Sequence, residues 1–209
     1  MLDGDAPSFI DSIERGTLFA FDLSQPVEPL PVADGVFIRA GEEHLNRIEH
    51  AMHASGEYPP GDPKRRWRRG RIPYVAMAGT EVASYGWVTF EPEPMDDLGI
   101  SFTAPPGEVW LYDFATVPEF RGRRLYPGLL RFILSQLKEQ GVKRAWIGTE
   151  PGNVASQHGI ERAGFTLVVE SKFVGRPGQG HFEVYPCEGV PDELTQAAVR
   201  TVHGRIVES

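Results

Sequence analysis

The sequence predicts an α/β fold in which helices flank one mixed, twisted central sheet. Residues 108–117 (EVWLYDFATV) form a nearly continuous apolar and aromatic run, which is typical of a buried strand. Residues 125–137 repeat leucine and isoleucine at helical spacing, and residues 144–149 form the next strand. A strand-helix-strand crossover makes its two strands parallel neighbours with a right-handed connection.

Antiparallel pairs on both sides of this crossover make the sheet mixed. Gly79-Thr80 joins one pair, and the glycine-rich stretch 175–180 joins the other as a hairpin loop, because it opens no helix. The strands expected around the crossover are residues 36–39, 72–78, 82–90, 165–174 and 181–185. The helices expected are residues 42–53, 125–141 and 153–163, the last two ended by Gly141 and Gly164.

We expect the main domain to span residues 35–188. Residues 1–34 show weak periodicity and end in the stretch PVEPLP, so they are interpreted as an N-terminal extension. Residues 189–209 form a C-terminal helical tail with Leu194, Ala198 and Val202 at helical spacing. The tail either docks on the domain or mediates self-association, so a homodimer stays open.

Composition excludes several classes of protein. The chain has 209 residues, a net charge of -8 and one cysteine, so a disulfide framework and a thiolate metal cluster are excluded. His50 and His53 lie on one predicted helix without a third ligand, so we expect no metal. No apolar run approaches the ~20 residues of a membrane helix. The N-terminus is acidic where a secretory signal is basic. We therefore expect a cytoplasmic protein with no membrane partner.

Residues 64–71 (KRRWRRGR) carry six positive charges in an otherwise acidic chain. The negative net charge argues against nucleic acid as a general partner, because phosphate neutralisation needs a positive surface. We interpret the cluster first as a solvated helix face followed by the start of a strand. The alternative is a patch that binds phosphate or an acidic ligand.

The junction at residues 117–128 (VPEFRGRRLYPG) leads from the buried strand through a tight turn into a helix. Free backbone N–H groups and the positive end of the helix dipole meet at such a turn and favour an anion. Arg121, Arg123 and Arg124 add charged donors. The junction alone therefore indicates a phosphate or carboxylate site.

This junction resembles the signature of the GNAT superfamily of N-acetyltransferases, Q/R-x-x-G-x-G/A after a strand, with residues 121–126 (RGRRLY) in that frame. A second landmark, Asn-x-x-Ala/Ser on a short helix that ends in Gly-Phe, is matched by Asn153, Ser156 and Gly164-Phe165. The resemblance covers roughly residues 36–185. It implies a GNAT-like sheet that splays between its two central parallel strands, where Val117 meets the next strand.

The resemblance also implies how acetyl-CoA is held, as a cosubstrate. Val117 would present backbone groups to the pantetheine arm, and amides from Gly122 to Tyr126 would hold the pyrophosphate. Asn153 and Ser156 would contact the pantetheine and nucleotide regions. The implied coenzyme-binding residues are Val117, Arg121, Gly122, Arg123, Arg124, Leu125, Tyr126, Asn153 and Ser156.

Three residues depart from the family pattern. Arg124 and Tyr126 stand where the signature has small residues, which changes how the turn approaches the phosphates. Pro127 removes one N–H donor but suits the first turn of a helix. Ile160 stands where a tyrosine often acts as general acid, so that proton donor is absent or comes from elsewhere.

The base that accepts the amine proton is the harder requirement. A thiolate leaves easily because its conjugate acid has a pKa of roughly 8.5, whereas deprotonating a lysine amine at pH 7 costs about 4–5 kcal/mol. Glu108, Trp110 and Tyr112 alternate onto one face of the strand, and Asp113 falls on the other. The candidate catalytic residues are Glu108, Tyr112 acting through a water, and Asp113. Asp113 is alternatively a buried carboxylate paired with a neighbour.

These expectations describe an acyltransferase that moves the acetyl group of acetyl-CoA to an amine of a small molecule or peptide, by direct attack on the thioester. The acceptor would enter between residues 55–71 and the strand pair at residues 165–185. The basic cluster suggests an acceptor with an acidic group, or a contact with the coenzyme's ribose phosphate. The alternative function is a CoA-binding regulatory or interaction module without catalysis.

Overall fold

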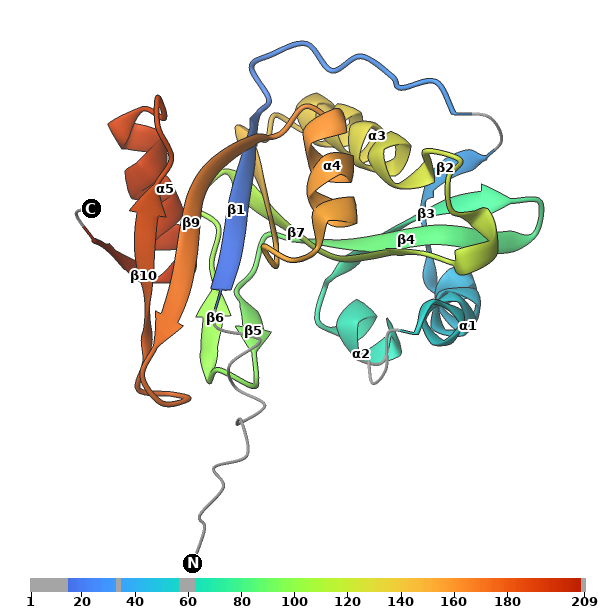
Figure 1. Ribbon diagram of the computed structural model, residues 1–209. Helices are drawn as coiled ribbons and strands as arrows, with labels where there is room; N and C mark the ends of the chain where they lie inside the picture. Colours follow the sequence, from blue (N-terminus) through green and yellow to red (C-terminus); the bar gives the residue numbers. More distant parts are fainter. Residues whose placement is uncertain (1–14, 33–34, 57–62, 208–209) are drawn as a thin grey trace, which may run out of the picture.

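The structure is a computed structural model that describes residues 15–32, 35–56 and 63–207. Within these residues one large sheet runs through the molecule (Figure 1). In sheet order its strands are β11 (Gly204–Ile206), β10 (His181–Pro186), β9 (Thr166–Val174), β1 (Arg15–Asp22), β8 (Arg144–Thr149), β7 (Glu108–Thr116), β4 (Glu81–Thr89), β3 (Ile72–Ala78) and β2 (Val36–Arg39).

Helices cover both faces of this sheet. On one face lie α3 (Leu125–Glu139) and α4 (Val154–Arg162), whose leucines and isoleucines pack on β1, β7 and β8. On the other face lie α1 (Leu45–Ser55), α2 (Pro63–Arg68), α5 (Asp192–Val202) and a hairpin made by β5 (Glu93–Met95) and β6 (Ile100–Phe102). Short 3-10 turns at Glu42–His44 and Pro118–Phe120 precede α1 and α3. The expected mixed α/β class is confirmed.

The two central parallel strands separate midway. β7 pairs with β8 from Glu108, opposite Arg144, to Leu111, opposite Ile147. β7 continues to Thr116 with β4 as its partner on the other side, while β8 no longer accompanies it. The sheet is therefore open between these strands beyond Leu111.

A bulge lies in the part of β7 that borders this opening. Asp113 and Phe114 together oppose the single residue Gly86 of β4, and Asp113 has a φ of 54°. A Cβ on Gly86 would lie 2.0 Å from the Phe114 ring, so glycine is required there. A bulge interrupts the alternation of side chains along a strand.

Residues 15–22 form β1 in the centre of the sheet, antiparallel to β8 and to β9. We expected them to belong to an N-terminal extension, and the structure corrects this. Leu18, Phe19, Ala20 and Phe21 are all buried, because the strand is covered on both faces. Such a strand has a continuous apolar run and lacks the alternation we searched for. The parts of the extension at residues 1–14 and 33–34 lie outside the described residues.

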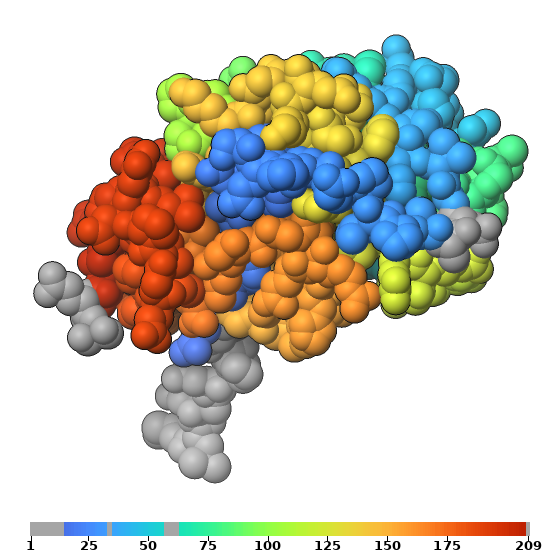
Figure 2. All heavy atoms as spheres, turned by 90° about the horizontal axis from the view of Figure 1, so that it is seen from above, coloured from blue at the N-terminus to red at the C-terminus, as the bar shows by residue number. Residues whose placement is uncertain are grey.

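The chain after β1 lies across the helical face. Lys138 Nζ on α3 donates to the carbonyl oxygens of Leu23 and Gln25, at 2.8 and 2.7 Å. Arg131 Nε donates to Glu28 O at 2.7 Å, and the same guanidinium donates to Ala163 O just after α4. Figure 2 shows this blue segment between α3 and α4. It ties the two helices together.

The C-terminal tail docks on the domain. Ala197, Ala198 and Val202 of α5 are buried against the sheet, and β11 extends the sheet by parallel pairing with β10. The sheet thus reaches beyond both of the expected limits, residues 35 and 188. Among the described residues, no helix has the length and apolar character that a membrane crossing requires.

Candidate active site

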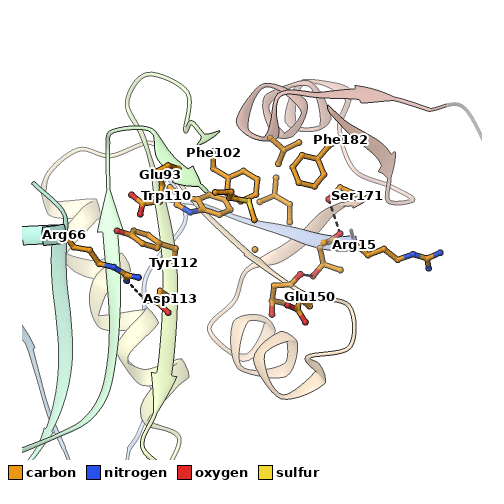
Figure 3. Close-up of a pocket in the computed structure, with 18 residues that line it drawn as sticks. Arg15, Arg66, Glu93, Phe102, Trp110, Tyr112, Asp113, Glu150, Ser171 and Phe182 are labelled. Atoms are coloured by element: carbon orange, nitrogen blue, oxygen red, sulfur yellow. Dashed lines mark hydrogen bonds and ion pairs between the residues drawn. The ribbon is translucent and has the colours of Figure 1, made fainter. Parts of the chain in front are cut away.

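Two cavities flank the opening between β7 and β8. The helix-side cavity, about 680 Å³, lies beneath α3 and α4. The hairpin-side cavity, about 350 Å³, lies on the opposite face, among β1, the β5–β6 hairpin and α5 (Figure 3). Both cavities are lined by the part of β7 that β8 does not pair with. A ligand that passes through the opening would therefore reach both cavities.

The turn before α3 forms the polar wall of the helix-side cavity. Gly122 and Arg124 both have positive φ, 78° and 61°. These conformations turn the chain so that α3 begins at Leu125. Within the described residues, no acceptor receives the backbone N–H groups of residues 122–126. Free N–H groups at the positive end of a 15-residue helix form an anion site.

The arginines of this turn have different surroundings. Arg121 Nε donates to Thr116 O at 3.1 Å, and Arg123 donates to Glu119 O and covers the Phe120 ring. Arg123 does not line the helix-side cavity. Arg124 and Arg162 do line it, and neither has an ion-pair partner among the described residues. These two cations remain available for an anion.

Tyr126, one of the departures from the family signature, fills the space between β7 and α4. Its ring lies 5.6 Å from the Phe114 ring, and a Cβ on Gly159 would lie 2.5 Å from it. Its hydroxyl lies 3.3 Å from Ser156 Oγ. Burial raises the pKa of Tyr126, so the phenol stays protonated at neutral pH. Asn153 Oδ1 accepts from Ser156 N at 3.1 Å and caps α4.

The structure places the expected coenzyme-binding residues unequally. The cavity brings together Arg121, Gly122, Arg124, Leu125, Tyr126, Asn153 and Ser156. Val117 lies elsewhere, since its N–H donates to Ala83 O and its side chain packs beneath α1. The strand residues that line the cavity are Phe114, Ala115 and Thr116, which the sequence analysis missed. They lie in the part of β7 beyond Leu111 that β8 does not pair with, and strand pairing is visible only in the folded chain.

The hairpin-side cavity has an aromatic wall. The ring of Phe102 lies 4.7 Å from that of Trp110 and 5.9 Å from that of Phe182. These three residues come from β6, β7 and β10, and Figure 3 shows them in one row. Leu18, Met95 and Val202 add aliphatic surface. Most of this cavity is therefore apolar.

Asp113 lines this same cavity, contrary to the expected alternation. The bulge turns its carboxylate to the side of Tyr112, where it pairs with the guanidinium of Arg66. That guanidinium also covers the rings of Trp87 and Tyr112, at 5.3 and 5.4 Å. The expectation of a paired carboxylate is confirmed.

The basic cluster is only partly the solvated face that we expected. Arg66 is 14% exposed in its ion pair with Asp113. Arg71 is 8% exposed, and its Nε lies 2.8 Å from Glu93 Oε2. Arg71 also donates to the carbonyl oxygens of Arg69 and Pro92. Two of the six cations thus brace the hairpin-side cavity, while Lys64, Arg65, Arg68 and Arg69 are exposed.

Tyr112 contributes its ring to the hairpin-side cavity. Its hydroxyl is buried and has no hydrogen-bond partner among the described residues. Burial raises the pKa of Tyr112, and the negative charge of Glu93 raises it further. The phenol and the Glu93 carboxylate are not in hydrogen-bonding geometry. A phenol that keeps its proton at neutral pH is a poor base. This argues against the proton-accepting role expected for Tyr112.

Glu108 lies at the start of β7, far along the strand from the opening. Its carboxylate accepts from Arg144 at 2.8 Å and from the indole N–H of Trp146. It lines neither cavity. These contacts give Glu108 a structural role in joining β7 to β8, and they disfavour it as a base.

Glu150 follows directly after β8 and lines the hairpin-side cavity. Its carboxylate is exposed and has no ion-pair or hydrogen-bond partner among the described residues. The sequence analysis missed it. Ligands of parallel sheets bind at the carboxyl ends of the strands, and this rule could have identified a residue one position beyond β8. Ile160 is fully buried beneath α3. No group of three or more possible metal ligands gathers among the described residues.

The sheet with its parted parallel strands has the topology of an acetyltransferase fold, and known proteins agree. A model of the acetyltransferase (GNAT) family matches residues 42–165, more than half of the chain. The chain therefore belongs to the acetyltransferase (GNAT) family. No curated protein matches it.

Solved structures share the fold at low sequence identity. A GCN5-related N-acetyltransferase from Sphaerobacter thermophilus aligns with a TM-score of 0.57 and 13% identity, over 76% of this chain and 50% of that one. A putative GNAT acetyltransferase from Novosphingobium aromaticivorans gives 0.54 and 18%, over 76% and 62%. The chain thus spans about half to three fifths of the length of these two.

A third structure shows the fold with a ligand. It is AAC(6')-Iy in complex with the bisubstrate analogue CoA-S-monomethyl-acetylneamine. It aligns with a TM-score of 0.51 and 16% identity, over 64% of this chain and 92% of that one.

Proposed function

We propose that this protein is an N-acetyltransferase that transfers the acetyl group of acetyl-CoA to an amine by direct attack on the thioester. The observation that carries the proposal is the opening between β7 and β8, with an anion site on one face of the sheet and a largely apolar cavity on the other. Membership of the GNAT family supports the reaction class. In AAC(6')-Iy a CoA analogue joined to an acceptor occupies the same fold.

The residues of the helix-side cavity fit a coenzyme with a diphosphate. Unbonded N–H groups of residues 122–126 suit phosphate oxygens, and Arg124 and Arg162 are unpaired cations beside them. The pantetheine arm would lie along the backbone of Phe114 and Thr116, in the part of β7 that β8 does not pair with. Acetyl-CoA would supply an acetyl group activated as a thioester.

The chain's own task is then to orient the amine and to remove its proton. At pH 7 this proton costs about 4–5 kcal/mol for a lysine-like amine and about 1 kcal/mol for an α-amine. Asp113 and Glu150 are the carboxylates nearest the two strands that part, one on β7 and one after β8. Asp113 is ion-paired with Arg66, which makes it a weaker candidate for the base. It would instead help to position the acceptor beside the opening.

No dedicated acid is required for the leaving group. A thiol with a pKa of roughly 8.5 departs as the thiolate near neutral pH. Ile160 offers no proton there, and the Tyr126 phenol, whose pKa is raised by burial, can donate a hydrogen bond while it keeps its proton.

Calorimetric titration with CoA tests the first step. We expect wild-type protein to bind CoA and Arg124→Ala to bind it roughly 10- to 100-fold more weakly, the value of a hydrogen bond to a charged group. Alanine and arginine bear a similar conformational cost at this positive φ. The loss of affinity therefore measures the contribution of the Arg124 guanidinium. Arg176→Ala, in the β9–β10 loop, is the matched control and should bind as wild type. Absence of CoA binding would reject the proposal.

A CoA-binding module without catalysis is the second candidate. The isoleucine at position 160 and the tyrosine at position 126, in place of the family's usual residues, favour it. It predicts CoA binding with no release of free thiol from acetyl-CoA in the presence of any amine. Thiol release that depends on an added amine would exclude it.

A further inference from the structure

The hairpin-side cavity restricts the acceptor to a narrow chemical class. Resting on the proposed function, we infer that the acceptor is a small primary amine with one positive charge and a compact apolar or aromatic body. Its ammonium group would be bound by Glu150, and its body by the aromatic wall of Phe102, Trp110 and Phe182.

Size supports a small molecule. The cavity measures about 350 Å³, at the lower end of the roughly 300–1,000 Å³ of small-molecule sites. It is bordered by β1, the β5–β6 hairpin, β7 and β8 where they part, and β10 with α5. β1 is hydrogen-bonded to a neighbouring strand on each edge, so it cannot swing aside for an extended peptide.

Chemistry supports an apolar body. The Phe102 ring on β6 lies 4.7 Å from the Trp110 ring and 5.9 Å from the Phe182 ring, and Leu18, Met95 and Val202 add aliphatic surface. Aromatic faces bind aromatic and cationic groups favourably. A hydrated polyhydroxylated acceptor would lose water against this wall and gain few hydrogen bonds in return.

Charge supports a single ammonium group. Two of the three carboxylates that line the cavity are already neutralised, Asp113 by Arg66 and Glu93 by Arg71. Glu150 is the lining carboxylate that lacks such a partner among the described residues. A second ammonium group would find no further unpaired carboxylate in the lining, so the extra charge of a polycation would lose water there without gaining an ion pair.

The position of Glu150 also gives the released proton a route. It lies at the carboxyl end of β8, beside the opening, and its carboxylate is exposed to solvent. The ammonium group passes one proton through Glu150 to water, and the neutral nitrogen attacks the carbonyl carbon. The C–N bond forms as the C–S bond breaks. The second nitrogen proton is then lost as the thiolate gains one, so the reaction yields amide, thiol and one proton.

The test is an acceptor panel read as free thiol from acetyl-CoA. The probes are 2-phenylethylamine, spermidine, kanamycin and a lysine-containing tripeptide, each at several concentrations. We expect kcat/KM for 2-phenylethylamine to exceed that of each other probe at least tenfold. A polycation or the peptide at the head of the panel would overturn the inference.

Two variants locate the selectivity. Glu150→Gln should raise KM for 2-phenylethylamine at least tenfold and leave KM for acetyl-CoA within twofold, because the helix-side cavity is untouched. Phe182→Leu should lower the ratio of kcat/KM for 2-phenylethylamine to kcat/KM for isopentylamine at least threefold. Glu188→Gln, an exposed carboxylate outside both cavities, is the control and should change neither constant.

The outcomes separate this inference from the proposed function. An unchanged amine KM in Glu150→Gln, with activity retained, overturns the role of Glu150. Acetyl-CoA that binds and reacts with polycations overturns the substrate class and leaves the proposed function standing. Acetyl-CoA that does not bind at all removes the proposed function, and this inference with it.

Discussion

The two cavities on either side of the β7–β8 opening are built in different ways. The helix-side cavity uses residues from two short stretches, 114–127 and 153–162, which are separated in the sequence by the rest of α3 and by β8. The hairpin-side cavity uses segments that range from Arg15 on β1 to Val202 on α5. The helix-side cavity can therefore be recognised from local sequence motifs, whereas the hairpin-side cavity exists only when the whole chain is folded.

The strongest test of this difference is deletion of β1. A chain that starts at residue 23 loses the central strand and one wall of the hairpin-side cavity. We expect it to lose its cooperative thermal transition, measured by circular dichroism. A chain that starts at Arg15 keeps every β1 contact that the structure describes and should melt as the full chain does. A cooperative transition without β1 would show that the sheet closes without it.

Removing Arg66 should damage the hairpin-side cavity alone. Arg66→Ala leaves the Asp113 carboxylate, 21% exposed, without its partner, and we expect a loss of about 1–3 kcal/mol after allowing for that exposure. The control is Arg65→Ala, an exposed neighbour on α2, which should stay within about 0.5 kcal/mol of wild type. Urea unfolding measures both. Because Arg66 lies on the opposite face from α3, CoA affinity should not change; a parallel loss would show that the cavities are coupled.

Gly159→Ala tests the helix-side cavity in the same way. The new Cβ would lie 2.5 Å from the Tyr126 ring, and this crowding outweighs the helix propensity gained, for a net loss of about 1 kcal/mol. Gly152→Ala is the control, since its Cβ would meet nothing within 4 Å. CoA affinity should fall in the first variant only. In a Tyr126→Ala background the same Gly159→Ala change should cost no stability, and a persisting loss would place the strain elsewhere.

The smallest effect concerns the buried phenols. The pKa values of Tyr74, Tyr112 and Tyr126 are raised by burial, so the folded protein keeps protons that the unfolded chain loses near pH 10. The unfolded state then binds fewer protons, and stability, complete below about pH 10, falls as the pH rises further. Tyr112→Phe should make this fall shallower. At pH 7 it should stay within about 1 kcal/mol of wild type, because the lost hydroxyl has no partner. Unfolding curves between pH 7 and 11 measure both, and an unaltered slope would contradict the assignment.

Sequence patterns predicted the elements around the helix-side cavity closely. The run at residues 108–117 became β7 (Glu108–Thr116), and the leucine stripe became α3 (Leu125–Glu139), because helical periodicity and a buried apolar run are local signals. The turn between them was predicted with its free amides. Arg124, which departs from the family's glycine, adopts the left-handed φ that this position requires.

The hairpin-side cavity depended on tertiary structure. The bulge at Asp113 reversed the predicted face of that residue, and no alternation rule reports a bulge. Arg66 and Arg71 were hidden within a run of six cations, since a sequence does not show which of several arginines meets a carboxylate. β1 was missed because a strand buried on both faces lacks alternation. Glu150 was missed because its place beside the opening depends on where β8 ends.

The position of β1 has a consequence for synthesis on the ribosome. Its Thr17 hydroxyl bonds to the carbonyl of Thr149, 132 positions later in the sequence. β1 is made well before both of its neighbours and can pair only after they emerge, and contacts so distant along the chain slow folding. Until residues 144–174 have emerged, the nascent protein holds an apolar segment with both edges unpaired, a form prone to association with other chains.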